Sequence, residues 1–163
     1  MTAAEDIFGR NEDMIFVSHY DSPLGMIYMA ADDDVLKGVW FEGQKYFASG
    51  LDKKETEDKE TPVLKQTKEW LDLYFVGKEP EFLPPLAPEG SEFQKKVWKI
   101  LLMIPYGKTM TYGEIGRKVA EMSGKKTMSA QAVGGAVGHN PISILIPCHR
   151  VVGTNGSLTG YAG

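Results

Sequence analysis

The sequence predicts a mixed α/β protein of the α+β class, built from two small domains. Its first half contains three strand-like runs and one helical run, and its second half repeats the signals that start helices. A proline-rich segment separates the two halves. With 163 residues, of which 42% are hydrophobic, the chain can form a hydrophobic core.

Turn-forming residues flank the strands that we expect in the first half. Residues 14–20 alternate between apolar and polar side chains, residues 24–31 follow Asp-Ser-Pro, and residues 35–41 follow three aspartates. Such short connections predict an antiparallel meander. Residues 51–61 are dense in charge, which predicts a loop or a weak helix. Residues 62–76 have apolar side chains at helical spacing, starting at a proline and stopping before a glycine, which predicts a helix.

The domain boundary is expected within residues 82–90, which contain three prolines and a glycine. These residues can continue neither a helix nor the ladder of a sheet. We therefore expect an N-terminal domain over residues 1–85, a linker over 86–90 and a C-terminal domain over 91–163.

Capping motifs predict a helical second domain. Residues 91–94 (Ser-Glu-Phe-Gln) have the form of a capping box and precede an apolar stripe. Residues 111–114 (Thr-Tyr-Gly-Glu) form a second box, opening a helix that runs to about Glu121. A third helix, over residues 129–138, is rich in glycine and alanine. The last two helices, joined by a tight turn at Gly124, are a helix-turn-helix candidate.

Charge is divided unevenly between the halves. Residues 91–163 contain nine Lys or Arg and three Asp or Glu, so their net charge is +6. Residues 1–90 contain nine Lys or Arg and nineteen Asp or Glu, so their net charge is −10. The total is −4. This split suggests an anion-binding surface on the second domain only. Taken alone, charge slightly favours the simpler interpretation, in which the lysines lie on solvated helix faces.

Cys148 is the only cysteine, and His149 follows it directly. A lone thiol cannot form an internal disulfide, so it serves packing or reactivity. A Cys-His pair by itself is more often a small buried residue beside an exposed histidine. Here Pro147 holds the thiol in a defined turn, and Asn140-Pro141 marks another turn upstream. This setting favours a thiolate nucleophile with a neighbouring base.

Composition indicates a cytoplasmic protein. A single cysteine suits a reducing compartment, residues 1–13 are polar and acidic unlike a signal peptide, and no apolar run approaches the roughly 18 residues of a membrane span. One cysteine and three scattered histidines form no metal-ligand cluster, and we interpret His139 as a surface residue. We expect no metal, no cofactor and no membrane partner.

A family resemblance rests on two segments. Residues 140–153 (Asn-Pro-Ile-Ser-Ile-Leu-Ile-Pro-Cys-His-Arg-Val-Val-Gly) and residues 160–163 (Gly-Tyr-Ala-Gly) resemble the active-site motif of the O6-alkylguanine-DNA alkyltransferases, the methylated-DNA–protein-cysteine methyltransferases. The resemblance is close from about Ser91 onward, and the first half resembles the family in layout. It implies a ribonuclease-H-like N-terminal domain and a winged-helix-like, DNA-binding C-terminal domain.

The resemblance also implies a function. The protein would be a monomer that repairs double-stranded DNA containing O6-alkylguanine, with O4-alkylthymine as a further candidate substrate. Cys148 would attack the alkyl carbon, and His149 would take the thiol proton through a water. Tyr112 would lie near the target phosphate and donate toward the departing guanine. The thioether is stable, so each molecule would act once. Without the resemblance, Tyr112 is more simply an ordinary aromatic at a helix start.

A protein thiol can reach the base only after the nucleotide has flipped out of the duplex. The resemblance places the third helix in the minor groove, where an early arginine fills the vacated space. This chain has Gln131 at that position, which can hydrogen-bond to the orphaned base but lacks the charge. Ala132, Gly134 and Gly135 would allow DNA to approach closely. Close helix packing is the alternative explanation for two glycines that each cost about 1 kcal/mol relative to alanine.

The remaining residues implied by the resemblance surround the cysteine. Asn140 would hold the turn of the cysteine loop, a role that an Asn before Pro serves without any chemistry. Val151 would supply a carbonyl to the floor of the guanine pocket. Tyr161 and Ala162 would form the lid of that pocket. Arg150 would be a structural or phosphate-facing charge.

Three other functions fit parts of the sequence. Alkyltransferase-like proteins that bind the lesion without chemistry lack the cysteine of the motif, so Cys148 argues against them. A cysteine hydrolase would need an oxyanion-hole motif, which is not visible, and neighbours such as Cys148 and His149 rarely point at each other. A transcription factor would explain the helix-turn-helix but not the cysteine loop.

The sequence stops at Gly163, fifteen residues after Cys148. In the family a further helix carries a glutamate that orients the histidine, and no residue here matches it. Either the sequence is a shortened form that lacks this helix, or another acid takes the place of the glutamate, and we expect the shortened form.

Overall fold

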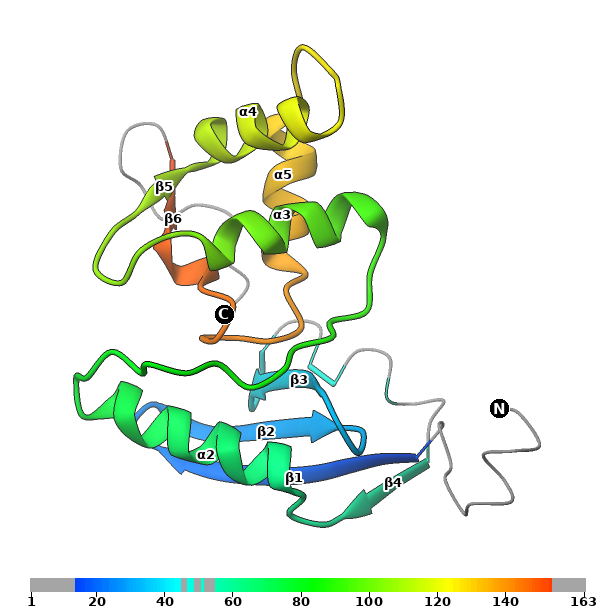
Figure 1. Ribbon diagram of the computed structural model, residues 1–163, viewed down its shortest axis with the longest axis vertical. Helices are drawn as coiled ribbons and strands as arrows, with labels where there is room; N and C mark the ends of the chain where they lie inside the picture. Colours follow the sequence, from blue (N-terminus) through cyan, green and yellow to red (C-terminus); the bar gives the residue numbers. More distant parts are fainter. Residues whose placement is uncertain (1–13, 45–46, 49–50, 52–54, 154–163) are drawn as a thin grey trace. The chain divides into compact units, whose positions relative to one another are not determined.

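Figure 1 shows the computed structural model of the chain, which describes residues 14–44, 47–48, 51 and 55–153. Internal contacts divide the chain into two units. The first comprises residues 1–43 and 47–87, and the second comprises residues 44–46 and 88–163. Among the described residues, no helix has both the length and the apolar character needed to cross a membrane.

The first unit is built on a four-stranded sheet with the order β3-β2-β1-β4. Strands β1 (Met14–Ser22), β2 (Gly25–Ala31) and β3 (Leu36–Phe41) form the antiparallel meander that the sequence predicts. The hairpin between β1 and β2 closes where Ser22 pairs with Gly25. Gly25 has a φ of 119°, a conformation that favours glycine.

The fourth strand corrects the sequence prediction. A loop or weak helix was expected over residues 51–61, but Glu55–Asp58 form β4, which pairs in parallel with β1. All four residues of β4 are exposed, and three of them are acidic. Charged side chains are typical of edge strands, where they discourage pairing with other chains. Because β4 has no alternation of apolar and polar residues, the sequence pattern does not predict it as a strand.

One helix, α2 (Pro62–Phe75), packs against β1 and β2 (Figure 1). Its start follows from local chemistry, because the Thr61 hydroxyl accepts from the backbone N–H of Leu64 and a proline occupies the first turn. At the other end, the ring of Phe75 stacks on that of Tyr20 in β1, with centroids 6.2 Å apart. The predicted helix over residues 62–76 is therefore confirmed to within one residue.

The chain leaves the first unit alongside β3. Leu36 donates its backbone N–H to the carbonyl of Pro85 at 2.8 Å and accepts from the N–H of Ala87 at 2.9 Å. Leu86 forms an isolated parallel bridge with Leu36. Two residues expected in the linker therefore bond within the first unit, because β3 is an edge strand whose backbone groups are available.

In the second unit, the residues that the structure describes form three main helices with the predicted starts. Helices α3 (Glu92–Leu102) and α4 (Tyr112–Met122) each begin with a complete capping box. Helix α5 (Ala130–Gly138) is capped by the hydroxyl of the serine before it. These side chains satisfy backbone donors that have no partner inside the helix. Two short strands, β5 (Met110–Thr111) and β6 (Val151–Val152), pair in parallel.

The link between α4 and α5 is longer than the tight turn that the sequence predicts. Helix α4 ends in a Schellman motif, in which the Lys125 N–H donates to the Ala120 carbonyl at 2.8 Å and Gly124 has a φ of 68°. Residues 123–129 then separate the two helices. The difference arises because Gly124 ends α4, whereas the next capping hydroxyl comes only at Ser129.

The helices of the second unit share one core. Trp98 of α3 is 2% exposed, and its indole N–H donates to the carbonyl of Ala136 in α5 at 2.9 Å. Helix α4 faces α5 at Gly116, where an added Cβ would make an ordinary contact, 3.7 Å from Val133. Other buried members of this core are Val97, Leu101, Ile115, Val119, Val137, Ile142 and Ile146.

Candidate active site

A buried loop leads from α5 to the cysteine, and Asn140 binds both ends of it. Asn140 is 4% exposed. Its Nδ2 donates to the carbonyl of Ile146 at 2.7 Å, and its Oδ1 accepts from the N–H of Ile142 at 3.0 Å. Between them, Ile144 has a φ of 70°, which is uncommon for a β-branched residue. Buried hydrogen bonds therefore impose the shape of this loop.

The loop ends in a single 3-10 turn, η1 (Cys148–Arg150). The backbone N–H of Cys148 donates to the Ile146 carbonyl at 2.8 Å, and that of Arg150 donates to the Pro147 carbonyl at 3.0 Å. Cys148 forms no disulfide, and its side chain is half-buried. A thiol that is partly exposed on a backbone held in this way can meet a ligand in a defined orientation.

Strand pairing brings Tyr112 to the cysteine. Thr111 in β5 pairs with Val152 in β6, so the start of α4 lies beside η1. Burial raises the pKa of the Tyr112 hydroxyl, and the nearby charge of Cys148 raises it further. Tyr112 therefore remains protonated at neutral pH and can donate a hydrogen bond next to the thiol.

His149 follows Cys148 in the turn and is half-buried. Its pKa is lowered from the ordinary value of 6.5, mainly by burial and secondarily by the positive charge of Arg150. An imidazole with a lowered pKa is neutral at pH 7, so it can accept a proton.

Arg150 has a structural contact that the sequence did not predict. Its Nη1 donates to the backbone carbonyl of Ile104, after α3, at 2.8 Å. Its guanidinium also lies over the ring of Tyr106, 5.5 Å from the centroid. Arg150 thus ties the cysteine turn to the end of α3. Val151, which follows it, is buried in β6.

The candidate DNA-contacting residues lie along α5. Gln131 and Ala132 are exposed in its first turn. An added Cβ at Gly134 would lie 3.9 Å from the Tyr112 ring, which is an ordinary contact. At Gly135 it would meet no atom within 4 Å among the described residues. Packing within the described structure therefore requires glycine at neither position, which argues against close helix packing as their explanation.

Two predicted pocket residues, Tyr161 and Ala162, lie outside the described residues. His139 is exposed and caps the end of α5. Among the described residues, no group of three His, Cys, Asp or Glu side chains could hold a metal ion.

Sequence reasoning missed two contacts that position the site. Trp98 belongs to the apolar stripe that follows residues 91–94, and a buried indole N–H needs an acceptor, which signals a partner on another element. The pairing of Arg150 with Ile104 left no such signal, because the acceptor is a backbone carbonyl 46 positions away.

Comparison with known proteins gives matches over both units. Residues 15–88 match the family model for the ribonuclease-like domain of 6-O-methylguanine DNA methyltransferase, and residues 92–163 match the model for its DNA binding domain. A methylated-DNA–protein-cysteine methyltransferase of Methanosarcina acetivorans is 42% identical over 149 residues, covering 91% of this chain and 90% of that protein. The constitutive protein of that name from Bacillus subtilis is 36% identical over 150 residues, covering 92% and 88%.

Solved structures agree with these matches. The crystal structure of Mycobacterium tuberculosis OGT in complex with DNA has a TM-score of 0.75 and 36% sequence identity, covering 91% of this chain and 84% of that chain.

Proposed function

Because the chain belongs to the 6-O-methylguanine DNA methyltransferase family, we propose that it repairs DNA by transferring the alkyl group of O6-alkylguanine to the sulfur of its own Cys148. O4-alkylthymine in DNA is the further candidate substrate. We also propose that it acts on double-stranded DNA as a monomer in the cytoplasm, and that it needs no cofactor.

One observation carries the proposal: the half-buried thiol of Cys148, the only cysteine of the sequence, lies beside Tyr112 and next to His149. These three groups supply a nucleophile, a hydrogen-bond donor and a neutral base. An alkyl transfer needs all three functions at one point.

The reaction is a displacement at carbon. The Cys148 thiolate attacks the alkyl carbon, and an S–C bond forms while the C–O6 bond breaks. The electron pair of the broken bond passes to guanine, toward which Tyr112 donates a hydrogen bond or a proton. His149 accepts the thiol proton through a water. The product is a stable thioether, so each molecule reacts once.

Helix α5 is the proposed DNA-reading element. Gly135 has open space where a side chain would stand, and exposed Gln131 lies one turn earlier on the same helix. Gly134 lies beside the Tyr112 ring, so DNA that approaches these glycines also approaches the thiol. In this arrangement Gln131 would occupy the space of the flipped nucleotide.

The test is the intact mass of the protein after incubation with a duplex that contains one O6-methylguanine. We expect a gain of one methyl group, at one equivalent per protein, and no gain with an otherwise identical unmodified duplex. The Cys148→Ser variant should gain none. Repeated turnover, or methylation of Cys148→Ser, would contradict the assignment.

A gel-shift assay beside the mass measurement distinguishes an alkyltransferase from a protein that only binds the lesion. Such a protein would retain the methylated duplex in a gel-shift assay without any change in mass. Cys148→Ser should behave in that way, whereas the natural sequence should release unmodified guanine in the DNA.

A further inference from the structure

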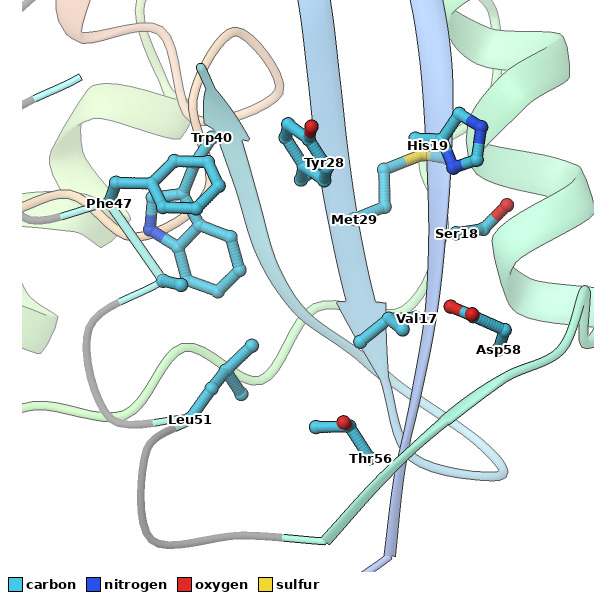
Figure 2. Close-up of a pocket in the computed structure, with 11 residues that line it drawn as sticks. Val17, Ser18, His19, Tyr28, Met29, Trp40, Phe47, Leu51, Thr56 and Asp58 are labelled. Atoms are coloured by element: carbon cyan, nitrogen blue, oxygen red, sulfur yellow. The ribbon is translucent and has the colours of Figure 1, made fainter. Parts of the chain in front are cut away.

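The first unit has a cavity of about 530 Å³ on one face of its sheet (Figure 2). Tyr20 of β1 donates a hydrogen bond to Asp72 of α2 at 2.6 Å, so its side chain points toward that helix. Successive side chains of a strand alternate between faces, so Val17 and His19 point the other way. Both line the cavity, which therefore opens on the face of the sheet that α2 leaves uncovered.

Aromatic rings form one side of this cavity. Trp40 is 3% exposed, and its indole lies across Gly38, where an added Cβ would come within 2.0 Å of the ring. The ring of Phe47 lies 6.3 Å from that of Trp40 and meets Tyr28 edge to face at 5.1 Å and 90°. Phe47 is 39% exposed and Tyr28 is 36% exposed, so their rings remain accessible to a ligand.

The carboxylate of Asp58 lies on the other side of the cavity. In the parallel pairing of β1 with β4, Asp58 lies opposite Val17, so both side chains share the face of the cavity. Figure 2 shows Asp58 on one side of Val17 and the rings of Trp40 and Phe47 on the other. Lys68, a lysine of α2, forms its ion pair with Glu60 and not with Asp58.

We propose that this cavity binds a small organic cation with a flat, apolar body, of the arylalkylammonium type. The electron-rich faces of Trp, Tyr and Phe attract cations, and the apolar floor at Val17 suits the body of such a ligand. Asp58 supplies the opposite charge on the face of β4 that lines the cavity. The cavity volume lies within the range of about 300–1,000 Å³ that is usual for small-molecule sites.

The test is a calorimetric titration of the whole chain with three probes of similar size. Benzyltrimethylammonium is cationic, benzyl alcohol is neutral and benzenesulfonate is anionic. We expect saturable binding of the cation, at least about fivefold weaker binding of the neutral probe and no binding of the anion. Equal binding of the cation and the alcohol would overturn the proposal, as would an absence of binding by every probe.

Two variants of β4 provide a matched pair. Asp58→Asn should weaken binding of the cation by about fivefold or more. Glu57→Gln removes the same charge from the adjacent exposed residue, whose side chain lies on the opposite face, and it should change the affinity little. Phe47→Ala should weaken binding of the cation as well. If Asp58→Asn and Glu57→Gln weakened binding of the cation equally, the attraction would come from the overall charge of β4, and the proposed site would be refuted.

Discussion

The side-chain amide of Asn140 donates to the backbone carbonyl of Ile146 at 2.7 Å, spanning the loop that precedes the cysteine. The same side chain accepts from the N–H of Ile142, so a single residue satisfies two buried backbone groups. The position of Cys148, whose own N–H also donates to the Ile146 carbonyl, depends on this arrangement.

Replacing Asn140 should therefore damage both stability and reactivity. Asn140→Ala leaves the buried N–H of Ile142 without its acceptor and removes one of the two donors to the Ile146 carbonyl, and we expect the free energy of unfolding to fall by about 2 kcal/mol. Denaturant unfolding measures this change, and labelling with O6-benzylguanine measures the reaction. Thr127→Ala, at an exposed position of the same unit, is the control and should change neither.

Replacing Gly135 should separate stability from DNA binding. Because the protein leaves open space there, Gly135→Ala should stabilise α5 by up to about 1 kcal/mol through helix propensity. The added methyl group should nevertheless weaken binding to duplex DNA, since it stands where we place the minor groove. Thermal unfolding and a duplex titration report the two effects. Unchanged DNA affinity would remove Gly135 from the interface.

Gln131 should matter only when a base must be flipped. We expect Gln131→Ala to slow repair of O6-methylguanine in duplex DNA much more than the reaction with free O6-benzylguanine, which needs no flipping. Gln131→Arg should restore or raise the rate on duplex DNA, because it adds a charge and a stacking plane. If Gln131→Ala slowed both reactions equally, the residue would serve the structure of α5 rather than extrusion.

Charge reversal should show that the DNA-binding surface lies on the second unit. Lys125 and Lys126 are exposed in the link between α4 and α5, and changing both to Glu should weaken binding to duplexes of any sequence and reduce its dependence on salt. The matched control reverses Lys65 and Lys78, which are exposed in the first unit. Binding isotherms at several salt concentrations provide the measurement. Equal losses from the two pairs would contradict the placement.

The rate of Cys148 alkylation should fall in acid with the protonation of His149. Because burial and Arg150 lower the pKa of His149, the base stays neutral to a lower pH, and the acid limb should have its midpoint below 6.5. Arg150→Gln removes the smaller of the two causes, so the midpoint should move up while remaining depressed by burial. Rates between pH 4 and 8, with an NMR titration of the His149 ring, test this prediction. An unmoved His149 pKa in Arg150→Gln would show that the guanidinium does not reach it.

Local signals predicted most of the elements. Ser91, Thr111 and Ser129 start helices because their hydroxyls bond to backbone groups within the same turn, and such short-range chemistry is legible in the sequence. Strand β4 escaped prediction because Glu55–Asp58 have no apolar alternation. Only their backbone pairing with β1 makes them a strand, and that pairing joins residues about forty positions apart.

The sequence by itself determined the chemistry that is available: one thiol, a histidine next to it, and an asparagine before the loop that carries them. The motif around Cys148 also determined the family. Tertiary structure alone decided that Tyr112 stands beside the thiol, that Arg150 bonds to Ile104, and that Asp58 shares a cavity with Trp40. These relationships join positions far apart in the chain, and they arise from strand pairing and packing, whose register no local pattern specifies.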